Sequence, residues 1–185
     1  VFDFRPISLC NVVYKLVAKV LVNQLKIILS NLVFESQSGF LFGRLISDNV
    51  LVAFETLYYF KRKTQGKLGF MTLKLDMSKA YDRVEWVFLE KIMKKLGFSE
   101  KLVTLIMSYL TSVSYAILLN GQPMGDIKPT RGLRQGDHLS PYLFLLCAMG
   151  QGLLKKAEAN GDIRGVSICR NGPRVSHLFF ADNSV

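Results

Sequence analysis

Two carboxylates lie where folding could bring acids together. Asp76 follows a short apolar run, and Asp182 follows the aromatic pair Phe179 and Phe180 in a pattern that predicts a hairpin. A carboxylate at the end of a buried strand is costly unless a cation compensates its charge. If the two strands lie side by side, the two acids can bind the same divalent metal ions. We therefore expect metal-ion chemistry centred on Asp76 and Asp182.

Each acid also has a simpler structural explanation. Asp76 could cap the start of the next helix, and Asp182 could be an ordinary turn residue. Either acid alone is weak evidence of a site. Between them, however, residues 131–137 form a glycine-bearing loop that ends in Arg-Gln-Gly-Asp. The combination of two acids and this loop favours a catalytic site.

The length and composition predict a folded domain. The chain has 185 residues, of which 50% are hydrophobic, so it can bury a core and is not expected to be disordered. No apolar run reaches the roughly 18 residues of a membrane span. The first residue is not Met and no signal pattern follows it, so we expect a fragment of a longer protein.

The net charge indicates a class of partner, and the cysteines indicate a redox compartment. The chain has 24 basic and 14 acidic residues, a net charge of +10, which favours phosphate-rich partners but also fits a solvated basic surface. The three cysteines, Cys10, Cys147 and Cys169, lack metal-ligand spacing. We expect free thiols in a reducing compartment.

Apolar spacing and capping residues predict the helices. Gly97 is placed to end one helix, and Ser99 to cap the next. The predicted helices cover residues 11–30, residues 47 or 48 to 63, residues 85–96, the segment after Ser99, and residues 140–159. Residues 61–67 are predicted to form a basic loop.

The strands are predicted from apolar runs and turn residues. Residues 70–75 resemble a strand buried on both faces. Residues 115–119 lead into a hairpin turn at Asn120 and Gly121, and residues 166–168 and 175–181 form a second hairpin. Helices that alternate irregularly with hairpin-linked strands predict the α+β class.

Five motifs in order then resemble the fingers and palm of a reverse transcriptase, of the non-LTR (LINE-type) retrotransposon kind found in plants. The resemblance runs from Phe4 to Val185. The motifs are residues 4–11, residues 37–40 with 43–44 and 48–49, residues 75–82, residues 134–137 with 139–141, and residues 180–182. It implies fingers over about residues 1–69, a palm with interleaved fingers elements over about 70–185, an antiparallel palm sheet backed by helices, and no thumb.

The resemblance implies an RNA-directed DNA polymerase that adds deoxynucleotides to a primer 3′ end by two-metal catalysis. Asp76, Asp182 and the Met77 carbonyl would bind two Mg²⁺ ions, with Mn²⁺ as an alternative. Oxygen ligands of this kind suit Mg²⁺. The implied partners are an RNA template, a DNA primer and a dNTP, without a membrane. A nuclear or cytoplasmic location is expected from the family.

The resemblance also implies nucleotide-binding residues. Tyr81 would lie beneath the sugar and exclude a 2′-hydroxyl, although an aromatic residue here also fits a core. Arg44 would contact the triphosphate, since a guanidinium can bind two phosphate oxygens. Gln135 and Gly136 would lie against the incoming nucleotide and the template.

Three positions differ from the family pattern. Asn183 stands where a second catalytic Asp is usual, and an amide is a poorer Mg²⁺ ligand. His138 and Phe42 each replace a usual Pro. We therefore expect an impaired polymerase. The alternatives are a non-catalytic nucleic-acid-binding remnant and an inert relic of a retroelement.

Overall fold

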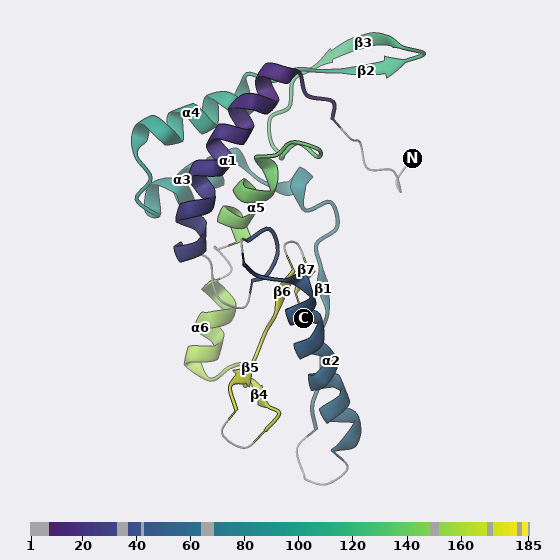
Figure 1. Ribbon diagram of the computed structural model, residues 1–185, viewed down its shortest axis with the longest axis vertical. Helices are drawn as coiled ribbons and strands as arrows, with labels where there is room; N and C mark the ends of the chain where they lie inside the picture. Colours follow the sequence, from purple (N-terminus) through teal and green to yellow (C-terminus); the bar gives the residue numbers. More distant parts are fainter. Residues whose placement is uncertain are drawn as a thin grey trace. The chain divides into compact units, whose positions relative to one another are not determined.

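The computed structural model (Figure 1) describes residues 8–32, 37–41, 43–63, 69–148, 152–169, 172–180 and 183–184. The chain divides into two compact units. Unit 1 comprises Val1–Ala18 and Lys79–Cys147, and unit 2 comprises Lys19–Ser78 and Ala148–Val185. Some predicted features lie outside the described residues: residues 4–7 of the first motif, Phe42, residues 64–67 of the basic loop, and Asp182.

The elements alternate as the α+β prediction requires, and the strand pairings described are all antiparallel. The helices are α1 (Val12–Leu32), α2 (Ile46–Arg62), the 3₁₀ helix η1 (Tyr81–Arg83), α3 (Trp86–Lys95), α4 (Glu100–Thr111), α5 (Ser140–Ala148) and α6 (Gly152–Asn160). The strands are β1 (Leu75–Asp76), β2 (Tyr115–Leu119), β3 (Gln122–Ile127), β4 (Val166–Ser167), β5 (Arg174–Val175), β6 (Phe179–Phe180) and β7 (Asn183–Ser184). No helix in the described ranges has the length and apolar character that crossing a bilayer requires.

The core of unit 1 forms between α3, α4 and α5. Helices α3 and α4 each bury one apolar face, whereas α5 is apolar on all sides. The fully buried side chains include Leu89, Met93, Ile106, Leu143 and Leu146. Burying a side chain of this size contributes about 1.5–3 kcal/mol.

The connection between α3 and α4 follows the predicted capping chemistry. Gly97 has a φ of +83°, and its N–H donates to the Lys94 carbonyl, while the Phe98 N–H donates to the Met93 carbonyl. These two bonds end α3 as a Schellman motif does. The Ser99 Oγ then accepts from the Leu102 N–H at 3.4 Å and caps α4.

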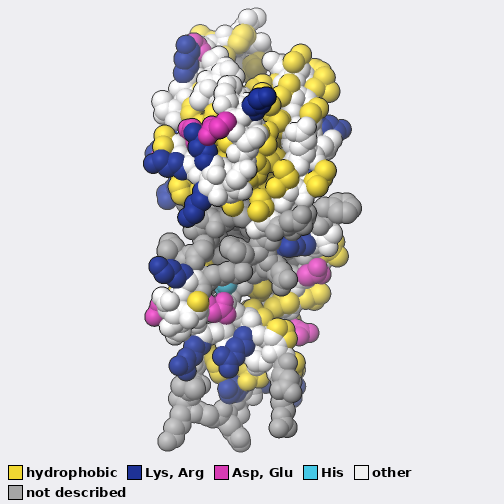
Figure 2. Space-filling model, turned by 90° about the vertical axis from the view of Figure 1, so that its left-hand side faces the viewer, with side chains coloured by type: hydrophobic (Ala, Val, Ile, Leu, Met, Phe, Trp, Pro, Cys, Tyr) yellow, Lys and Arg dark blue, Asp and Glu magenta, His cyan; other side chains and the backbone are white. Residues whose placement is uncertain are grey.

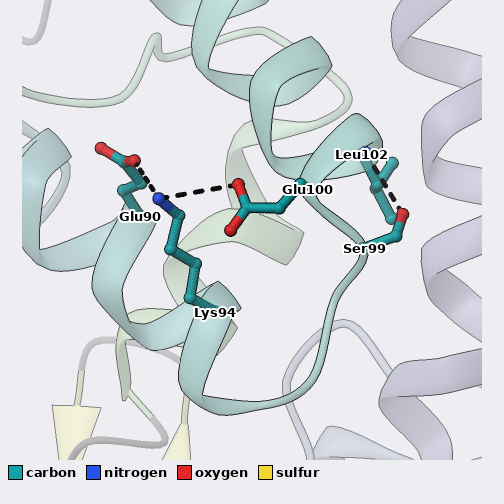
Figure 3. A network of polar contacts seen from close by, with 5 residues as sticks. All are labelled: Glu90, Lys94, Ser99, Glu100 and Leu102. Atoms are coloured by element: carbon teal, nitrogen blue, oxygen red, sulfur yellow. Dashed lines mark hydrogen bonds and ion pairs between the residues drawn. The ribbon is translucent and has the colours of Figure 1, made fainter.

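The same connection carries a surface ion-pair cluster (Figure 3). The Lys94 Nζ lies 2.8 Å from a Glu90 oxygen and 3.7 Å from a Glu100 oxygen. Glu100 is exposed and Lys94 and Glu90 are partly exposed, so the cluster adds little stability. It links the end of α3 to the start of α4.

Strands β2 and β3 form the predicted hairpin. Asn120 (φ +49°) and Gly121 (φ +81°) both adopt the left-handed conformation that a two-residue type I′ turn requires. The register pairs Leu119 with Gln122. Both strands are exposed except at Tyr115, so the hairpin projects from unit 1 (Figure 1).

Unit 2 contains a three-stranded antiparallel sheet in the order β1-β7-β6. The register pairs Leu75 with Ser184 and Asp76 with Asn183 across β1 and β7, and Phe180 with Asn183 across β6 and β7. A separate two-stranded pair, β4 with β5, forms the second predicted hairpin. The strand predicted over residues 175–181 is not continuous, because residues 176–178 have no strand structure and β5 and β6 belong to different sheets. At Gly165 an added Cβ would lie 2.9 Å from the Val175 carbonyl carbon, so this position accepts only glycine without a backbone shift.

The predicted buried strand over residues 70–75 is wrong. Residues 69–74 have no regular structure and are exposed, and only Leu75 and Asp76 pair with another strand. A strand needs a pairing partner, and no residue in the described ranges pairs with residues 69–74. The Phe70 ring stacks instead on Phe60, at 5.0 Å between centroids.

The helix predicted over residues 140–159 is described as α5 and α6, and residues 149–151 between them lie outside the described ranges. The prediction of the basic loop needs correction. Lys61 and Arg62, predicted to begin the basic loop, belong to the last turn of α2.

Apolar side chains remain exposed as well. Figure 2 shows hydrophobic side chains gathered over the upper part of the face that it presents, with Lys and Arg side chains around them. Large exposed residues include Val13 and Leu16 of α1, Phe88 of α3 and Leu105 of α4. Exposed apolar area of this extent is typical of interaction surfaces.

Candidate active site

Asp76 lies at the end of β1, opposite the start of β7. Its Cα partner in the antiparallel register is Asn183, and residues paired in this way have Cα atoms about 4.5–5.5 Å apart. Asn183 directly follows Asp182, whose own placement lies outside the described residues. The sheet therefore brings Asp76 beside the backbone of the β6–β7 segment that carries the second acid.

The donors around Asp76 are oxygen atoms. Asp76 and Met77 are both exposed residues at the end of β1. The described ranges contain no group of three or more His, Cys, Asp or Glu side chains that could hold a metal ion, and Asp182 is not among the residues searched. Exposed oxygen donors fit a hydrated Mg²⁺ ion, which keeps several of its waters.

Arg44 lies in unit 2 and stabilises its own loop. Its Nη1 donates to the Gln37 carbonyl at 2.7 Å, and the buried Gln37 accepts from the Gly39 N–H through Oε1 at 3.1 Å. A guanidinium has five N–H donors. The contact with Gln37 uses one of these donors and holds the guanidinium against the residue 37–41 segment.

Tyr81 begins the 3₁₀ helix η1 in unit 1. Its ring is half-buried and lies 5.3 Å from the Phe144 ring of α5, with a tilt of 39°. Tilted aromatic pairs at this distance contribute about 0.5–1.5 kcal/mol beyond their area. The packing against α5 holds the Tyr81 ring in a defined position.

The loop at residues 131–134 is bound to η1 by backbone hydrogen bonds. The Gly132 N–H donates to the Val84 carbonyl at 2.8 Å, and the Leu133 N–H donates to the Tyr81 carbonyl at 2.9 Å. The Trp86 Nε1 donates to the Gly132 carbonyl at 2.8 Å. These bonds tie the loop that leads to Gln135 to the helix that carries Tyr81.

We predict that Gly132→Ala destabilises the chain by about 1–3 kcal/mol. Its φ is +88°, a conformation that costs a residue with a Cβ about 1–2 kcal/mol, and the added Cβ would lie 3.3 Å from the Asp82 Cα. Gly125→Ala is the matched control, because Gly125 has a φ of +78° and no atom within 4 Å. Urea unfolding of both variants measures the difference, and equal losses would show that the close approach to η1 contributes nothing.

Arg134, the first residue of the Arg-Gln-Gly-Asp motif, is enclosed by aromatic and sulfur groups. Its guanidinium carbon lies 4.3 Å from the Tyr14 ring centroid and 5.3 Å from the Tyr115 centroid. Its Nε donates to the Tyr115 hydroxyl at 3.3 Å, and its Nη1 donates to the Cys10 Sγ at 3.2 Å. Burial alone would lower the pKa of Arg134, but the hydrogen bonds to Cys10 and Tyr115 outweigh this effect and raise it.

Asp137, the last residue of the motif, is 6% exposed and accepts two hydrogen bonds. The Tyr109 hydroxyl donates to its Oδ1 at 2.9 Å, and the Leu139 N–H donates to the same oxygen at 3.2 Å. The Tyr14 ring stacks on Tyr109 at 3.9 Å. Burial raises the pKa of Tyr14 to about 12, and burial followed by the charge of Asp137 raises the pKa of Tyr109 well above its usual range.

Gln135 and Gly136 are therefore held from both sides. The Gln135 carbonyl accepts from the Ser8 N–H at 2.9 Å, which joins the loop to the first motif. Gly136 is exposed and has a φ of +95°. Arg134 and Asp137 fix the ends of this two-residue segment, and Gly136 leaves its outer side open.

Sequence reasoning identified Gln135 and Gly136 but missed the residues that position them. Tyr14 and Tyr109 lie in apolar helical stripes, and only their hydroxyls distinguished them from ordinary core residues. A tyrosine in a buried stripe normally finds a polar partner. That rule could have linked Tyr109 to the charged loop that follows the hairpin.

The fold defines the class of protein. The structure is similar to that of apo telomerase from Candida tropicalis truncated from its C-terminal domain, with a TM-score of 0.50 and 17% identity over 92% of this chain and 32% of that one. This similarity confirms the predicted fold, a right-hand polymerase with fingers and palm. The chain itself matches the family described as reverse transcriptase (RNA-dependent DNA polymerase) over residues 2–184, and it belongs to that family.

Curated relatives refine the type of reverse transcriptase. The chain is 33% identical over 144 residues to the transposon TX1 uncharacterized 149 kDa protein of Xenopus laevis, covering 78% of this chain and 11% of that protein. It is 27% identical over 156 residues to the retrovirus-related Pol polyprotein from a type-1 retrotransposable element R2 of Popillia japonica, covering 80% and 21%. The chain is thus a reverse transcriptase domain of the non-LTR retrotransposon type, and it spans about a fifth or less of these two relatives.

A plant protein is also similar over a shorter segment. An uncharacterized mitochondrial protein of Arabidopsis thaliana is 48% identical over 68 residues, which cover 36% of this chain and 56% of that protein. The shared segment is too short to define the source of the chain.

Proposed function

We propose that this chain is part of an RNA-directed DNA polymerase from a plant LINE-type retroelement, and that Asn183 impairs its catalysis. The chain would bind an RNA template, a DNA primer and a dNTP. The register that pairs Asp76 with Asn183, the residue after Asp182, carries the proposal. The identity with the Arabidopsis protein supports a plant source. The division into fingers at about residues 1–69 and palm at about 70–185 stays a prediction.

Asp76, Asp182 and the Met77 carbonyl would hold two Mg²⁺ ions, with Mn²⁺ as an alternative. When bound, the two ions would activate the primer 3′-hydroxyl and neutralise the departing pyrophosphate. The contribution of the chain is to place the acids. Strand β1 holds Asp76 at an exposed strand end, and the β1–β7 pairing places the backbone of Asn183 opposite it.

Asn183 supports the proposal of impairment. It substitutes a neutral amide for the carboxylate usual at this position, which removes a negative charge beside Asp76 and a hard anionic donor. The backbone pairing of β7 does not depend on that side chain. An Asn183→Asp substitution can therefore restore the charge without changing the strand.

The test is primer extension on an RNA template with Mg²⁺. Because the relatives are much longer, the assay uses the chain completed with the remaining segments of a reverse transcriptase. We expect Asn183→Asp to raise the extension rate by about 100-fold or more, since a metal site contributes several kcal/mol of transition-state stabilisation. An equal rate for Asn183 and Asn183→Asp would contradict the impairment.

Other residues would bind the incoming nucleotide. Tyr81 would lie beneath the sugar, Gln135 and Gly136 against the base and the template, and Arg44 against the triphosphate. The anchored ends of the Gln135–Gly136 segment support this assignment, because they hold the segment still with its outer side open. A rigid surface beside the nucleotide reduces the entropy cost of alignment.

We predict that Tyr81→Ala, in the Asn183→Asp background, admits ribonucleotides. Removal of the ring opens the space that a 2′-hydroxyl needs, and we expect discrimination between dNTP and rNTP to fall by about 10- to 100-fold. Tyr81→Phe is the control, because it keeps the ring and its packing on Phe144. The ratio of kcat/KM for the two nucleotides is the measurement, and unchanged sugar discrimination in Tyr81→Ala would reject this role for the ring.

A second candidate is a nucleic-acid-binding remnant without turnover, favoured by Asn183 and the net charge of +10. Such a protein would bind a primer–template with an affinity that falls steeply with salt. It would not extend the primer, with or without Asn183→Asp. The extension assay therefore separates the two candidates.

A further inference from the structure

Helix α2 exposes aromatic side chains that the proposed polymerase site does not use. Phe54 is 70% exposed and Tyr58 is 55% exposed, one helical turn apart on the same face. Within unit 2, α2 extends from the β1–β7 sheet towards the β4–β5 hairpin (Figure 1). Exposed aromatic residues at helical spacing are uncommon on a solvated surface.

These side chains border an open hollow of about 500 Å³. Its lining, which we term the α2 aromatic surface, consists of Phe54, Glu55, Tyr58, Tyr59, Arg62 and Ile168. The lining is mainly apolar, with one guanidinium and one carboxylate among the rings. The hollow is large enough for a nucleobase with its sugar.

The cations around the surface are placed over rings. The Arg62 guanidinium carbon lies 5.5 Å from the Tyr58 centroid, and its Nη1 donates to the Tyr58 hydroxyl at 3.3 Å. The Lys63 Nζ lies 4.3 Å from the Phe70 centroid and 5.7 Å from the Tyr59 centroid. With Lys61, three consecutive basic residues follow the exposed aromatic residues of α2.

The rings behind the surface are packed together. Phe60 and Phe70 stack with an interplanar angle of 6°, and the Tyr59 centroid lies 6.3 Å from each of them. These two contacts support the Tyr59 ring. A base that stacked on the outer rings would meet a surface that is already ordered, which lowers the entropy cost of binding.

We propose that the α2 aromatic surface binds single-stranded RNA, with a base against Tyr58 and Phe54 and the adjoining phosphates on Arg62 and the neighbouring lysines. Aromatic rings beside a basic stretch form the usual platform for single strands, because every base has a face that can stack. The charge complementarity between residues 61–63 and a phosphate backbone supports RNA as the occupant. The inference rests on the proposed function only in taking RNA as the nucleic acid that the protein handles.

Glu55 adds a base preference. Its carboxylate lies in the lining of the hollow and can accept a hydrogen bond from the amino group of cytosine, whereas uracil presents a carbonyl at the same position. The two pyrimidines have similar stacking areas. Cytosine should therefore bind better than uracil.

The test measures binding of fluorescein-labelled rC12 and rU12 to the 185-residue chain by fluorescence anisotropy. We expect Tyr58→Ala to weaken rC12 binding by about 5- to 100-fold, the range for loss of one base-stacking ring. Tyr58→Phe keeps the ring and should bind within about twofold of the unchanged chain. Leu51→Ala is the matched control, since Leu51 is exposed on α2 but lies outside the hollow.

Two further measurements sharpen the result. Arg62→Gln should reduce the slope of log affinity against log salt by about 0.7, the value for one phosphate contact in a single strand. Glu55→Gln should narrow the preference for rC12 over rU12, because a neutral amide can pair with either base. Equal binding of rC12 by Tyr58→Ala and Leu51→Ala would overturn the proposal. That result is also the one expected if the surface binds a protein partner instead of RNA.

The outcome is separable from that of the polymerase assay. If Tyr58→Ala loses rC12 binding and Asn183→Asp does not extend the primer, RNA binding by the α2 aromatic surface is supported and the polymerase function is rejected. If Asn183→Asp extends the primer and Tyr58→Ala binds rC12 unchanged, RNA binding by the α2 aromatic surface is rejected and the polymerase function is retained.

Discussion

Asp76→Asn is expected to reduce primer extension by at least about 1,000-fold in the completed domain that carries Asn183→Asp. Asp76 is the acid whose position the β1–β7 register defines, and it lies exposed at a strand end. An amide has almost the same shape as the carboxylate but no charge to hold a divalent ion. The loss should therefore reflect metal binding rather than packing.

Asp162→Asn serves as the control for this experiment. Asp162 is an exposed acid of the same unit, beyond the end of α6, and we expect its extension rate to stay within about twofold. Titration with Mn²⁺ adds a second readout, since a weakened metal site needs more metal for half-maximal rate. If Asp76→Asn extended primers as fast as Asp162→Asn, Asp76 would not be a metal ligand.

Asp137→Ala is expected to lower the free energy of unfolding by about 3 kcal/mol. The substitution leaves the Tyr109 hydroxyl and the Leu139 N–H without their acceptor in a buried position. Asp137→Asn keeps an oxygen in place and should cost about 1 kcal/mol, because only the charge is lost. Urea unfolding followed by circular dichroism is the measurement.

A double-mutant cycle with Tyr109→Phe isolates the hydrogen bond between the two side chains. We expect a coupling energy of about 1–2 kcal/mol, since the acceptor is charged. Additive losses would indicate that Asp137 stabilises the loop only through the Leu139 N–H. In that case the Tyr14–Tyr109 stack would not help to position Gln135.

The features that could be predicted from the sequence are those with local causes. Gly97 and Ser99 end and begin helices through bonds within their own turns, and Asn120–Gly121 specifies a hairpin by its backbone preference. The strand predicted over residues 70–75 failed because pairing depends on a partner distant in sequence, and within the described ranges only Leu75 and Asp76 of this segment find one. Apolar composition alone could not reveal that.

In the candidate site, too, locally encoded features could be predicted and features that depend on distant residues could not. The motif resemblance located Asp76 and Gln135, but the residues that hold the loop in place come from far along the chain. The Tyr14 hydroxyl bonds the Tyr109 carbonyl across 95 positions, and Arg134 reaches Cys10 across 124. Such contacts join residues that form no pattern in sequence. Only the folded chain identifies Arg134 and Asp137 as anchors of the loop.

Two cysteines, Cys147 and Cys169, are expected to differ in their rates of alkylation. Burial raises the pKa of the Cys147 thiol in α5 to about 12, whereas Cys169 is exposed. Since alkylating reagents attack the thiolate, the exposed Cys169 should be modified faster than the half-buried Cys147, whose raised pKa lowers its thiolate fraction. Isotope-coded iodoacetamide, added in timed pulses, would therefore report the accessibility of α5, the helix that packs against Tyr81.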